Sequence, residues 1–212
     1  MADTTVVHLL RHGEVENPAN VLYGRLPGYH LSETGRRMAE TVAKAMAARD
    51  IVEVRSSPLE RAIETATPLA EGFGLDVVLD DRLLEAGNVF EGHPMGEGRG
   101  VFRNVRNYRH LWNPFRPSWG ERYLDVVDRM KAAIDAARGA ARGHEAILVS
   151  HQLPIWIIRA AAEGRRLWHD PRQRQCGLAS MTSLTFEGDR LISVGYSEPA
   201  GSLVRRPSVP GA

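Results

Sequence analysis

The chain has 212 residues, of which 43% are hydrophobic and 25% charged, and its formal net charge is +1. This length suits one sizeable core better than two full domains, and so small a basic excess argues against nucleic acid as a partner. The single cysteine excludes an internal disulfide and no segment has the length and apolarity of a membrane span, so we expect a cytoplasmic protein without a membrane partner.

The first predicted strand covers residues 6–10, a short apolar run that leads directly into an Arg-His-Gly tripeptide. A loop rich in glycine, proline and asparagine follows over 13–30. Ser32 then predicts the N-cap of a helix, because the apolar residues after it keep helical spacing as far as residue 49.

A second strand is predicted over 51–54, and the residues after it carry several helix-start signals. Ser57 is the expected N-cap, Pro58 takes the first helical position, and Glu60 completes a capping box. This helix is expected to stop near a pair of glycines, before a third strand over 75–79.

Between residues 87 and 120 the regular pattern gives way to glycine, proline, asparagine and aromatic residues, with a weak helical pattern inside. An insertion of this length in a compact domain is usually functional, so we expect a lid. The remaining predicted elements are, in chain order, a helix over 120–141, a strand over 146–150, a helix led by Pro154 that runs to 163, and a hairpin of strands 181–186 and 191–196. Residues 199–212 are expected to form a mobile C-terminal tail.

Strands that alternate with helices predict an α/β fold, here a three-layer sandwich with a mainly parallel central sheet and helices on both faces. Residues 1–198 are expected to form this single domain. In such sheets ligands bind outside the carboxyl ends of the strands. Three polar clusters follow predicted strands and should meet at that edge: Arg11 with His12, Ser56 and Ser57 with Arg61, and Ser150 with His151.

The chemistry of these clusters suits a phosphate group. Arg61 falls in the first turn of its predicted helix, where free backbone N–H groups and the helix dipole favour an anion. Each residue alone also has an ordinary structural interpretation. His12 could be a hydrogen-bonded histidine at a strand end, and Arg61 a surface side chain. Glu85, a further candidate that follows the third predicted strand, could likewise be an ordinary surface carboxylate.

Taken jointly, the motifs of residues 7–196 resemble those of the histidine phosphatase superfamily, the phosphoglycerate mutase-like group. They follow one another in the family's order and at its approximate spacing. The motifs are Leu10-Arg11-His12-Gly13-Glu14, Leu31-Ser32-Glu33-Thr34-Gly35, Ser56-Ser57-Pro58-Leu59-Glu60-Arg61-Ala62 with Thr65-Ala66, Leu84-Glu85 with Phe90-Glu91-Gly92, and Val149-Ser150-His151.

The resemblance implies a role for each of five residues. His12 would attack phosphorus and form a covalent phosphohistidine. Arg11, Arg61 and His151 would bind the phosphoryl oxygens and spread the charge of the transition state. Glu85 would protonate the leaving oxygen and then take a proton from the attacking water.

Three further residues are expected at the rim of the phosphate pocket. Asn17 comes one residue earlier than in the usual family pattern, and Gln152 stands where the family usually has glycine after the second histidine. Gly24 completes this set of candidate phosphate-binding residues.

We expect a metal-independent phosphomonoester hydrolase that acts on small phosphorylated metabolites without a cofactor. His8 and His12 have the spacing of a helical metal pair, but four residues of strand span roughly 13 Å, too far for two ligands of one ion. No cluster of cysteine, histidine or carboxylate residues has the spacing of a metal site. The sequence specifies no oligomeric state.

Two alternatives remain. The first is phosphoryl transfer of the cofactor-dependent phosphoglycerate mutase type, which uses the same catalytic centre. Those mutases share a lid with a Tyr-Gly-x-Leu-x-Gly-Leu-Asn-Lys run, which is missing between Gly92 and Glu121, and this favours the hydrolase. The second is a non-catalytic module that binds a phosphate ligand.

Overall fold

The computed structural model describes residues 3–94 and 119–204, in which the strands form one sheet with the order β3-β2-β4-β1-β5-β6. The first four of these strands are parallel, whereas β5 and β6 are antiparallel to their neighbours. The strands are β1 (Thr4–Arg11), β2 (Ile51–Ser56), β3 (Val77–Leu79), β4 (Glu145–Ser150), β5 (Met181–Glu187) and β6 (Arg190–Ser197).

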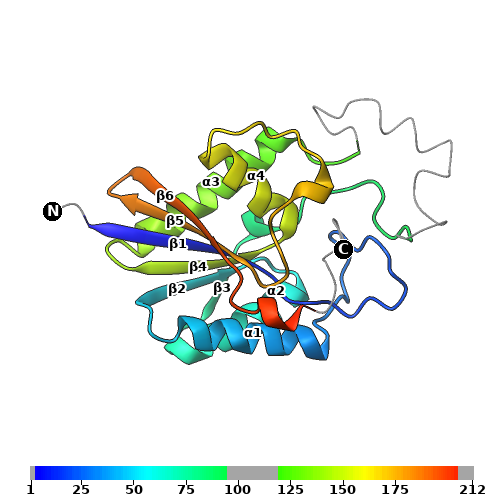
Figure 1. Cartoon of the computed structure of the whole chain (residues 1–212), viewed down its shortest axis with the longest axis horizontal. Helices are drawn as coiled ribbons and strands as arrows, with labels where there is room; N and C mark the ends of the chain where they lie inside the picture. Colours follow the sequence, from blue (N-terminus) through cyan, green and yellow to red (C-terminus); the bar gives the residue numbers. More distant parts are fainter. Residues whose placement is uncertain (1–2, 95–118, 205–212) are drawn as a thin grey trace.

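Helices cover the two faces of this sheet, as Figure 1 shows, with α1 and α2 on one side and α3 and α4 on the other. The helices are α1 (Glu33–Met46), α2 (Glu60–Phe73), α3 (Tyr123–Ala140) and α4 (Gln152–Ala162). The predicted three-layer α/β sandwich with a mainly parallel sheet is therefore confirmed. Among the described residues, no helix is both long and apolar enough to cross a membrane.

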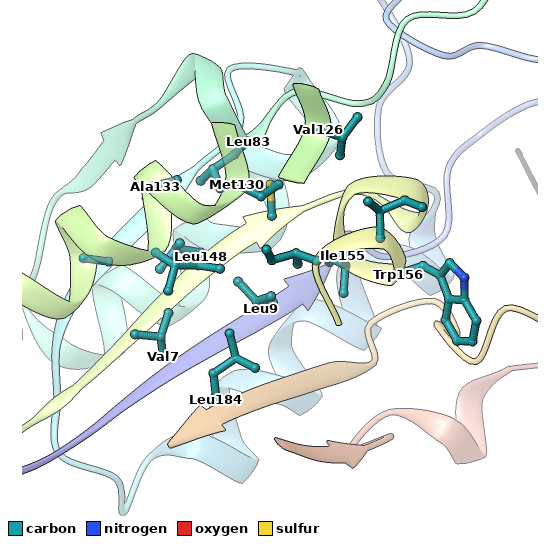
Figure 2. Close-up of a cluster of buried hydrophobic side chains, with 14 of the residues drawn as sticks. Val7, Leu9, Leu83, Val126, Met130, Ala133, Leu148, Ile155, Trp156 and Leu184 are labelled. Carbon is teal, nitrogen blue, oxygen red and sulfur yellow. The ribbon is translucent and has the colours of Figure 1, made fainter. Parts of the chain in front are cut away.

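The central strands are apolar on both faces, because each face packs against a helical layer. Leu9 and Leu148 are fully buried in the cluster under α3 and α4, where Figure 2 shows them beside Met130 and Ile155. Leu10 points to the opposite cluster, under α1 and α2. Truncation of such a buried leucine to alanine typically lowers the free energy of unfolding by about 2–5 kcal/mol. The strands whose carboxyl ends carry the polar clusters are thus held in place by a well-packed core on both faces.

The register of the parallel strands decides which side chains meet at that edge. Arg11, the last residue of β1, pairs with Ser150, the last residue of β4. The next residue of each strand is a histidine, and His12 N donates a hydrogen bond to Ser150 O at 3.1 Å. His12 and His151 therefore leave adjacent strands at the same level.

Helix α1 has the predicted start, whereas helix α2 does not. Ser32 is the N-cap of α1, and its hydroxyl accepts a hydrogen bond from Gly35 N at 3.0 Å. The expected capping box of α2 is wrong, because the N-cap is Leu59 and no side chain caps it. The Ser57 hydroxyl is hydrogen-bonded to His151 at 2.8 Å and accepts only a long bond, 3.5 Å, from Leu59 N, so the tertiary contact takes precedence over a local cap.

Two other boundaries differ from the sequence prediction. Strand β3 begins at Val77, not at residue 75, because Leu75 N donates to Ala70 O and so belongs to the end of α2. Helix α4 begins at Gln152, two residues before the expected Pro154.

The start of the expected C-terminal tail is packed on the domain. A 3₁₀ turn, η5 (Gly201–Leu203), follows β6, and Ala200 is fully buried in the cluster under α1 and α2. Residues 199–204 are therefore packed against the domain and do not form the mobile tail that the sequence predicted. The rest of the predicted tail, 205–212, lies outside the described residues.

The expected lid insertion enters and leaves the domain at one place. Asn88 and Gly120 form an isolated β-bridge, and Val89 N donates to Trp119 O at 2.8 Å. The interior of the predicted lid, residues 95–118, lies outside the described residues.

Candidate active site

Five residues singled out in the sequence come together at the carboxyl edge of the sheet: Arg11, His12, Arg61, Glu85 and His151, called here the phosphate pocket. Arg11, His12, Arg61 and His151 are all buried, with at most 2% of each side chain exposed. The centres of the two histidine rings are 5.1 Å apart.

His12 is held in one orientation by its own backbone. Its Nδ1 lies 2.8 Å from Gly13 O, a carbonyl that can only accept a hydrogen bond. The proton therefore sits on Nδ1, and Nε2 carries the lone pair. Burial and the charges of Arg61 and Arg11 hold the pKa of His12 well below its usual value. The ring is thus neutral at physiological pH and ready to act as a nucleophile.

The loop after His12 is fixed by close packing. Gly13 N donates to the Thr65 hydroxyl at 3.1 Å, which ties the loop to α2. A Cβ on Gly13 would meet Gly35 O at 2.7 Å, and one on Gly35 would meet Glu14 O at 2.0 Å. These contacts require glycine at both positions, and they hold the His12 loop against the first turn of α1 and the second turn of α2.

Arg61 supplies a buried positive charge from the first turn of α2. Its Nη2 donates to Gly24 O at 2.6 Å, and its guanidinium lies 4.7 Å from the centre of the Tyr23 ring. Its Nε and Nη1 are buried and have no hydrogen-bond partner among the described residues. Buried donors are usually paired, so these two N–H groups indicate a place for an anion.

The loop over 13–31 is attached to α2 at several points besides Arg61. Glu60 Oε1 accepts a hydrogen bond from Gly28 N at 3.0 Å. One turn later, Glu64 Oε2 accepts from Leu31 N at 2.8 Å. The loop and the first two turns of α2 therefore form one hydrogen-bonded unit.

Arg11 and His151 complete the positive side of the pocket. Arg11 Nη1 donates to Cys176 O at 2.7 Å. His151 Nε2 is 2.8 Å from the Ser57 hydroxyl, and its Nδ1 is buried without a partner among the described residues. Burial and the charge of Arg61 hold the pKa of His151 well below its usual value, so this ring is also neutral. In the tautomer in which Nε2 accepts from the Ser57 hydroxyl, the Nδ1–H is a donor for an oxyanion.

Glu85 provides the acidic group. It follows the 3₁₀ turn η1 (Asp81–Leu83), and its Oε1 accepts a hydrogen bond from Ala86 N at 2.8 Å. Burial raises the pKa of Glu85, although Ala86 N–H and the neighbouring arginines act in the opposite direction. A carboxyl group with a raised pKa can hold a proton near neutral pH and pass it to a leaving group.

The three expected rim residues act mainly on other protein groups. Both amide atoms of Asn17 bond to the backbone of Val21, with Nδ2 donating to its carbonyl and Oδ1 accepting from its N–H. Gly24 has a φ of +43° and presents its carbonyl to Arg61. The Gln152 side chain reaches Cys176 O and Arg174. Their direct contact with phosphate stays a prediction.

Sequence reasoning missed three residues of the site: Tyr23, Thr65 and Arg174. It placed Ser57 at the correct edge of the sheet but interpreted its hydroxyl as a helix cap, and Thr65, inside a recognised motif, received no role. Tyr23 stands next to Gly24 and could have been found as a buried aromatic beside a glycine turn. Arg174 belongs to a long connection with no periodic pattern, so no sequence signal pointed to it.

The described residues contain no group of three or more histidine, cysteine, aspartate or glutamate side chains that could hold a metal ion. His8, the partner of His12 in the rejected metal pair, is bonded to Ser183 and Glu145. The positive charge of the pocket comes from guanidinium groups.

Comparisons with known proteins agree on one family. The histidine phosphatase superfamily (branch 1) matches residues 7–198. Uncharacterized protein Rv0525 of Mycobacterium tuberculosis is 55% identical over 200 residues, 94% of this chain and 99% of that protein. The 2,3-bisphosphoglycerate-dependent phosphoglycerate mutase of Thermoplasma acidophilum is 31% identical over 193 residues, 88% and 90% of the two chains. The solved structure of mycobacterial glucosyl-3-phosphoglycerate phosphatase Rv2419c has a TM-score of 0.69 and 26% identity, over 92% of this chain and 98% of that one.

Proposed function

Because this chain belongs to the histidine phosphatase superfamily, we propose that it is a phosphomonoester hydrolase that acts on small phosphorylated metabolites in the cytoplasm. It works without a metal ion and through a phosphohistidine at His12. One observation carries the proposal. A neutral imidazole with a free Nε2 lone pair shares its pocket with three buried nitrogen atoms that lack partners among the described residues: the donors Arg61 Nε and Arg61 Nη1, and His151 Nδ1.

In the first step, His12 Nε2 attacks phosphorus in line with the ester oxygen. The N–P bond forms as the P–O bond breaks, and the proton of the Glu85 carboxyl passes to the leaving oxygen, so the alcohol departs neutral. Arg61, Arg11 and His151 hold the three phosphoryl oxygens. Their N–H groups are fixed before the substrate arrives and stabilise the charge of the transition state without rearranging.

In the second step, water attacks the phosphohistidine. The Glu85 carboxylate takes a proton from that water, the N–P bond breaks, and inorganic phosphate leaves with His12 Nε2 restored. The same residue serves as acid and then as base, which requires a pKa raised above that of an ordinary glutamate. Burial of Glu85 supplies this shift.

A mutase activity is the second candidate, supported by the relative in Thermoplasma acidophilum. A mutase must keep its phosphohistidine away from water until an acceptor hydroxyl is in place. The stretch between Gly92 and Glu121 lacks the lid run shared by cofactor-dependent mutases, and this favours water as the acceptor.

The test is a rapid quench at neutral to alkaline pH with a labelled phosphomonoester. We expect an acid-labile, base-stable label and steady release of inorganic phosphate. His12→Ala should lose both, whereas His144→Ala, a half-exposed histidine paired with Asp50, should keep both. Label on a serine, or full activity of His12→Ala, would contradict the mechanism.

Two parallel measurements complete the test. If the label is long-lived and passes to a phosphoglycerate rather than to water, the protein is a mutase. If no ester is turned over, the remaining alternative is a non-catalytic module that binds a phosphate ligand. Dialysis against EDTA should leave the rate unchanged, because arginines supply the charge that a metal would otherwise bring. Loss on chelation with rescue by a divalent ion would refute metal independence.

A further inference from the structure

The connection between α4 and β5 carries a third arginine to the phosphate pocket. In Figure 1 it is the yellow-to-orange segment that leaves α4 and returns to β5. It contains a 3₁₀ turn, η4 (Pro171–Gln173), and Arg174 follows directly after it. Unlike Arg11 and Arg61, this residue belongs to none of the motifs that identify the family.

Arg174 is held in place by two side chains. Its Nε donates to His169 Nε2 at 2.8 Å, and its Nη1 reaches Gln152 Oε1 at 3.4 Å. His169 can accept this bond because its Nδ1 donates to Leu167 O at 2.6 Å, which leaves the lone pair on Nε2. The His169 ring packs 5.6 Å from the centre of the Trp156 ring, so the partner of Arg174 is itself fixed.

A short chain of hydrogen bonds joins Arg174 to the residues that hold phosphate. Cys176 O accepts from Arg11 Nη1 at 2.7 Å and from Gln152 Nε2 at 3.4 Å, and the other end of the Gln152 amide meets Arg174. The charge of Arg174 also acts on Glu85, the proposed donor to the leaving oxygen. These hydrogen bonds to the partners of Arg11, together with the interaction with Glu85, are the grounds on which we place Arg174 on the side where the alcohol part of the ester leaves.

Within the described part of the chain, Arg174 forms no ion pair with a carboxylate. Its neighbour Arg172 differs, because it pairs with Asp170 at 2.7 Å on the surface. Burial lowers the pKa of Arg174, but a guanidinium stays charged in proteins. The carboxyl group whose charge acts on Arg174 is Glu85, and in the proposed mechanism it is protonated when the ester binds. A largely buried cation without an ion-pair partner is unfavourable, and an anionic ligand would relieve this.

We propose that Arg174 determines substrate specificity by binding a carboxylate on the alcohol part of the phosphomonoester. This inference rests on the proposed function and names the substrate class of the same site. Nε is occupied by His169 and one N–H of Nη1 contacts Gln152 Oε1 at 3.4 Å, so the second N–H of Nη1 and the Nη2 group are the donors that would bind the substrate. Two parallel N–H groups match the two coplanar oxygens of a carboxylate.

The test uses a pair of esters that differ in one group. 3-Phosphoglycerate carries a carboxylate where sn-glycerol 3-phosphate carries a hydroxymethyl group. The wild type should prefer the first by at least about tenfold in kcat/KM, and Arg174→Gln should lower that ratio about 10- to 100-fold, mainly through KM for 3-phosphoglycerate. Arg174→Lys, which keeps a charge but not the fork, should give an intermediate ratio.

Arg172→Gln is the matched control, since it removes an exposed arginine from the same connection, and its ratio should equal that of the wild type. An Arg174→Gln variant that slows both esters equally would show an action through Glu85 and overturn the proposal, as would a wild type without preference. The proposal would also be overturned if Arg174→Gln lowered kcat/KM more for 1,3-propanediol bisphosphate than for 3-phosphoglycerate. That result would identify a second phosphate as the ligand of Arg174.

A binding measurement separates this proposal from the proposed function. Calorimetry of the same two esters gives the ratio of dissociation constants without turnover, in the His12→Ala background with and without Arg174→Gln. If the wild type releases no phosphate from either ester, the hydrolase proposal fails, and the binding ratio still decides the role of Arg174. A ratio that Arg174→Gln leaves unchanged would overturn it.

Discussion

The two ends of the central strands use the same kinds of side chain in opposite ways. Near the amino end lie four side chains that contact one another, called here the amino-end cluster: His8, Arg49, Glu145 and Ser183. Glu145 accepts from His8 Nε2 at 2.9 Å and pairs with Arg49 at 2.7 Å, while His8 Nδ1 meets the Ser183 hydroxyl at 2.8 Å. Every ring nitrogen and carboxylate oxygen there has a partner.

At the carboxyl end, the phosphate pocket is left incomplete. Arg61 and His151 are more deeply buried than Glu145, yet three of their side-chain nitrogen atoms have no partner among the described residues. A closed network of charges contributes to the stability of the fold, whereas an open one is unfavourable until a ligand completes it. The comparison predicts that substitutions in the phosphate pocket will lower activity with little loss of stability. Substitutions in the amino-end cluster should lower stability with little loss of activity.

The largest effect is expected from Arg61→Gln. Loss of a fixed cation that stabilises a phosphoryl transition state typically lowers turnover about 10³-fold or more. Glutamine can still donate to Gly24 O, and the variant no longer buries a charge, so the free energy of unfolding should stay within about 1 kcal/mol or rise. Steady-state kinetics with p-nitrophenyl phosphate and urea titration measure the two quantities. A large loss of stability in parallel with activity would contradict the comparison.

Glu85→Gln should come second and should depend on the leaving group. The rate on an alkyl phosphate should fall about 10²-fold or more, because an alkoxide leaves poorly without a proton. The loss on p-nitrophenyl phosphate, whose leaving group needs little protonation, should be much smaller. Equal losses on the two esters would exclude Glu85 as the proton donor.

The pH profile of the wild type tests the same residue. Glu85 must be protonated in the first step, so activity should fall as the pH rises through its raised pKa. His12 must be neutral, and because its pKa is lowered it remains so into the acid range. The optimum should therefore lie on the acid side of neutrality. An optimum above pH 8 would contradict this assignment.

Binding of phosphate in the phosphate pocket should stabilise the protein, and this effect should be smaller than the losses of activity described above. Inorganic phosphate at 100 times its dissociation constant should raise the free energy of unfolding by about 2.7 kcal/mol. Thermal unfolding with and without phosphate measures this, with chloride at equal ionic strength as the control. Arg61→Gln should lose most of the shift, and an equal shift in that variant would place the anion elsewhere.

The smallest effect is expected at the closed end. Glu145→Gln should lower the free energy of unfolding by about 2 kcal/mol and leave kcat/KM within about twofold of the wild type. Burial alone would raise the pKa of Glu145, but hydrogen bonds from Arg49 and His8 outweigh it and lower the pKa. Its contribution is therefore present above the unfolded pKa and lost as the pH falls through the lowered folded-state pKa, so variant and wild type should converge only at pH values below that pKa. Urea titration at several pH values checks both points.

The sequence predicted the fold and the meeting of the motifs because both follow from local rules. Apolar runs that alternate with amphipathic helices imply a parallel sheet, and the carboxyl ends of parallel strands share one edge. Arg11, His12 and His151 directly follow strands, so their meeting needed no knowledge of packing. The position of Arg61 at the same edge could also be predicted, because it lies in the first turn of the helix after β2.

The missed features depend on tertiary contacts. Ser57 has every local signal of a helix cap, but its hydroxyl bonds to His151, whose position along the chain gives no hint of this. Asn17 bonds to Val21 within its own loop. Arg174 reaches the pocket because the connection after α4 packs on Trp156 through His169. No periodicity or motif encodes these contacts.

The hydrogen bonds between α2 and the loop over 13–31 have a consequence for local opening. Gly28 N and Leu31 N are bonded to Glu60 and Glu64, side chains of the helix that also carries Arg61. Because one element holds all of these contacts, the two loop amides should exchange with deuterium at a common rate, set by one opening event. That event would also release Arg61 from Gly24 O. Bound phosphate should therefore slow exchange at two amides that do not touch it.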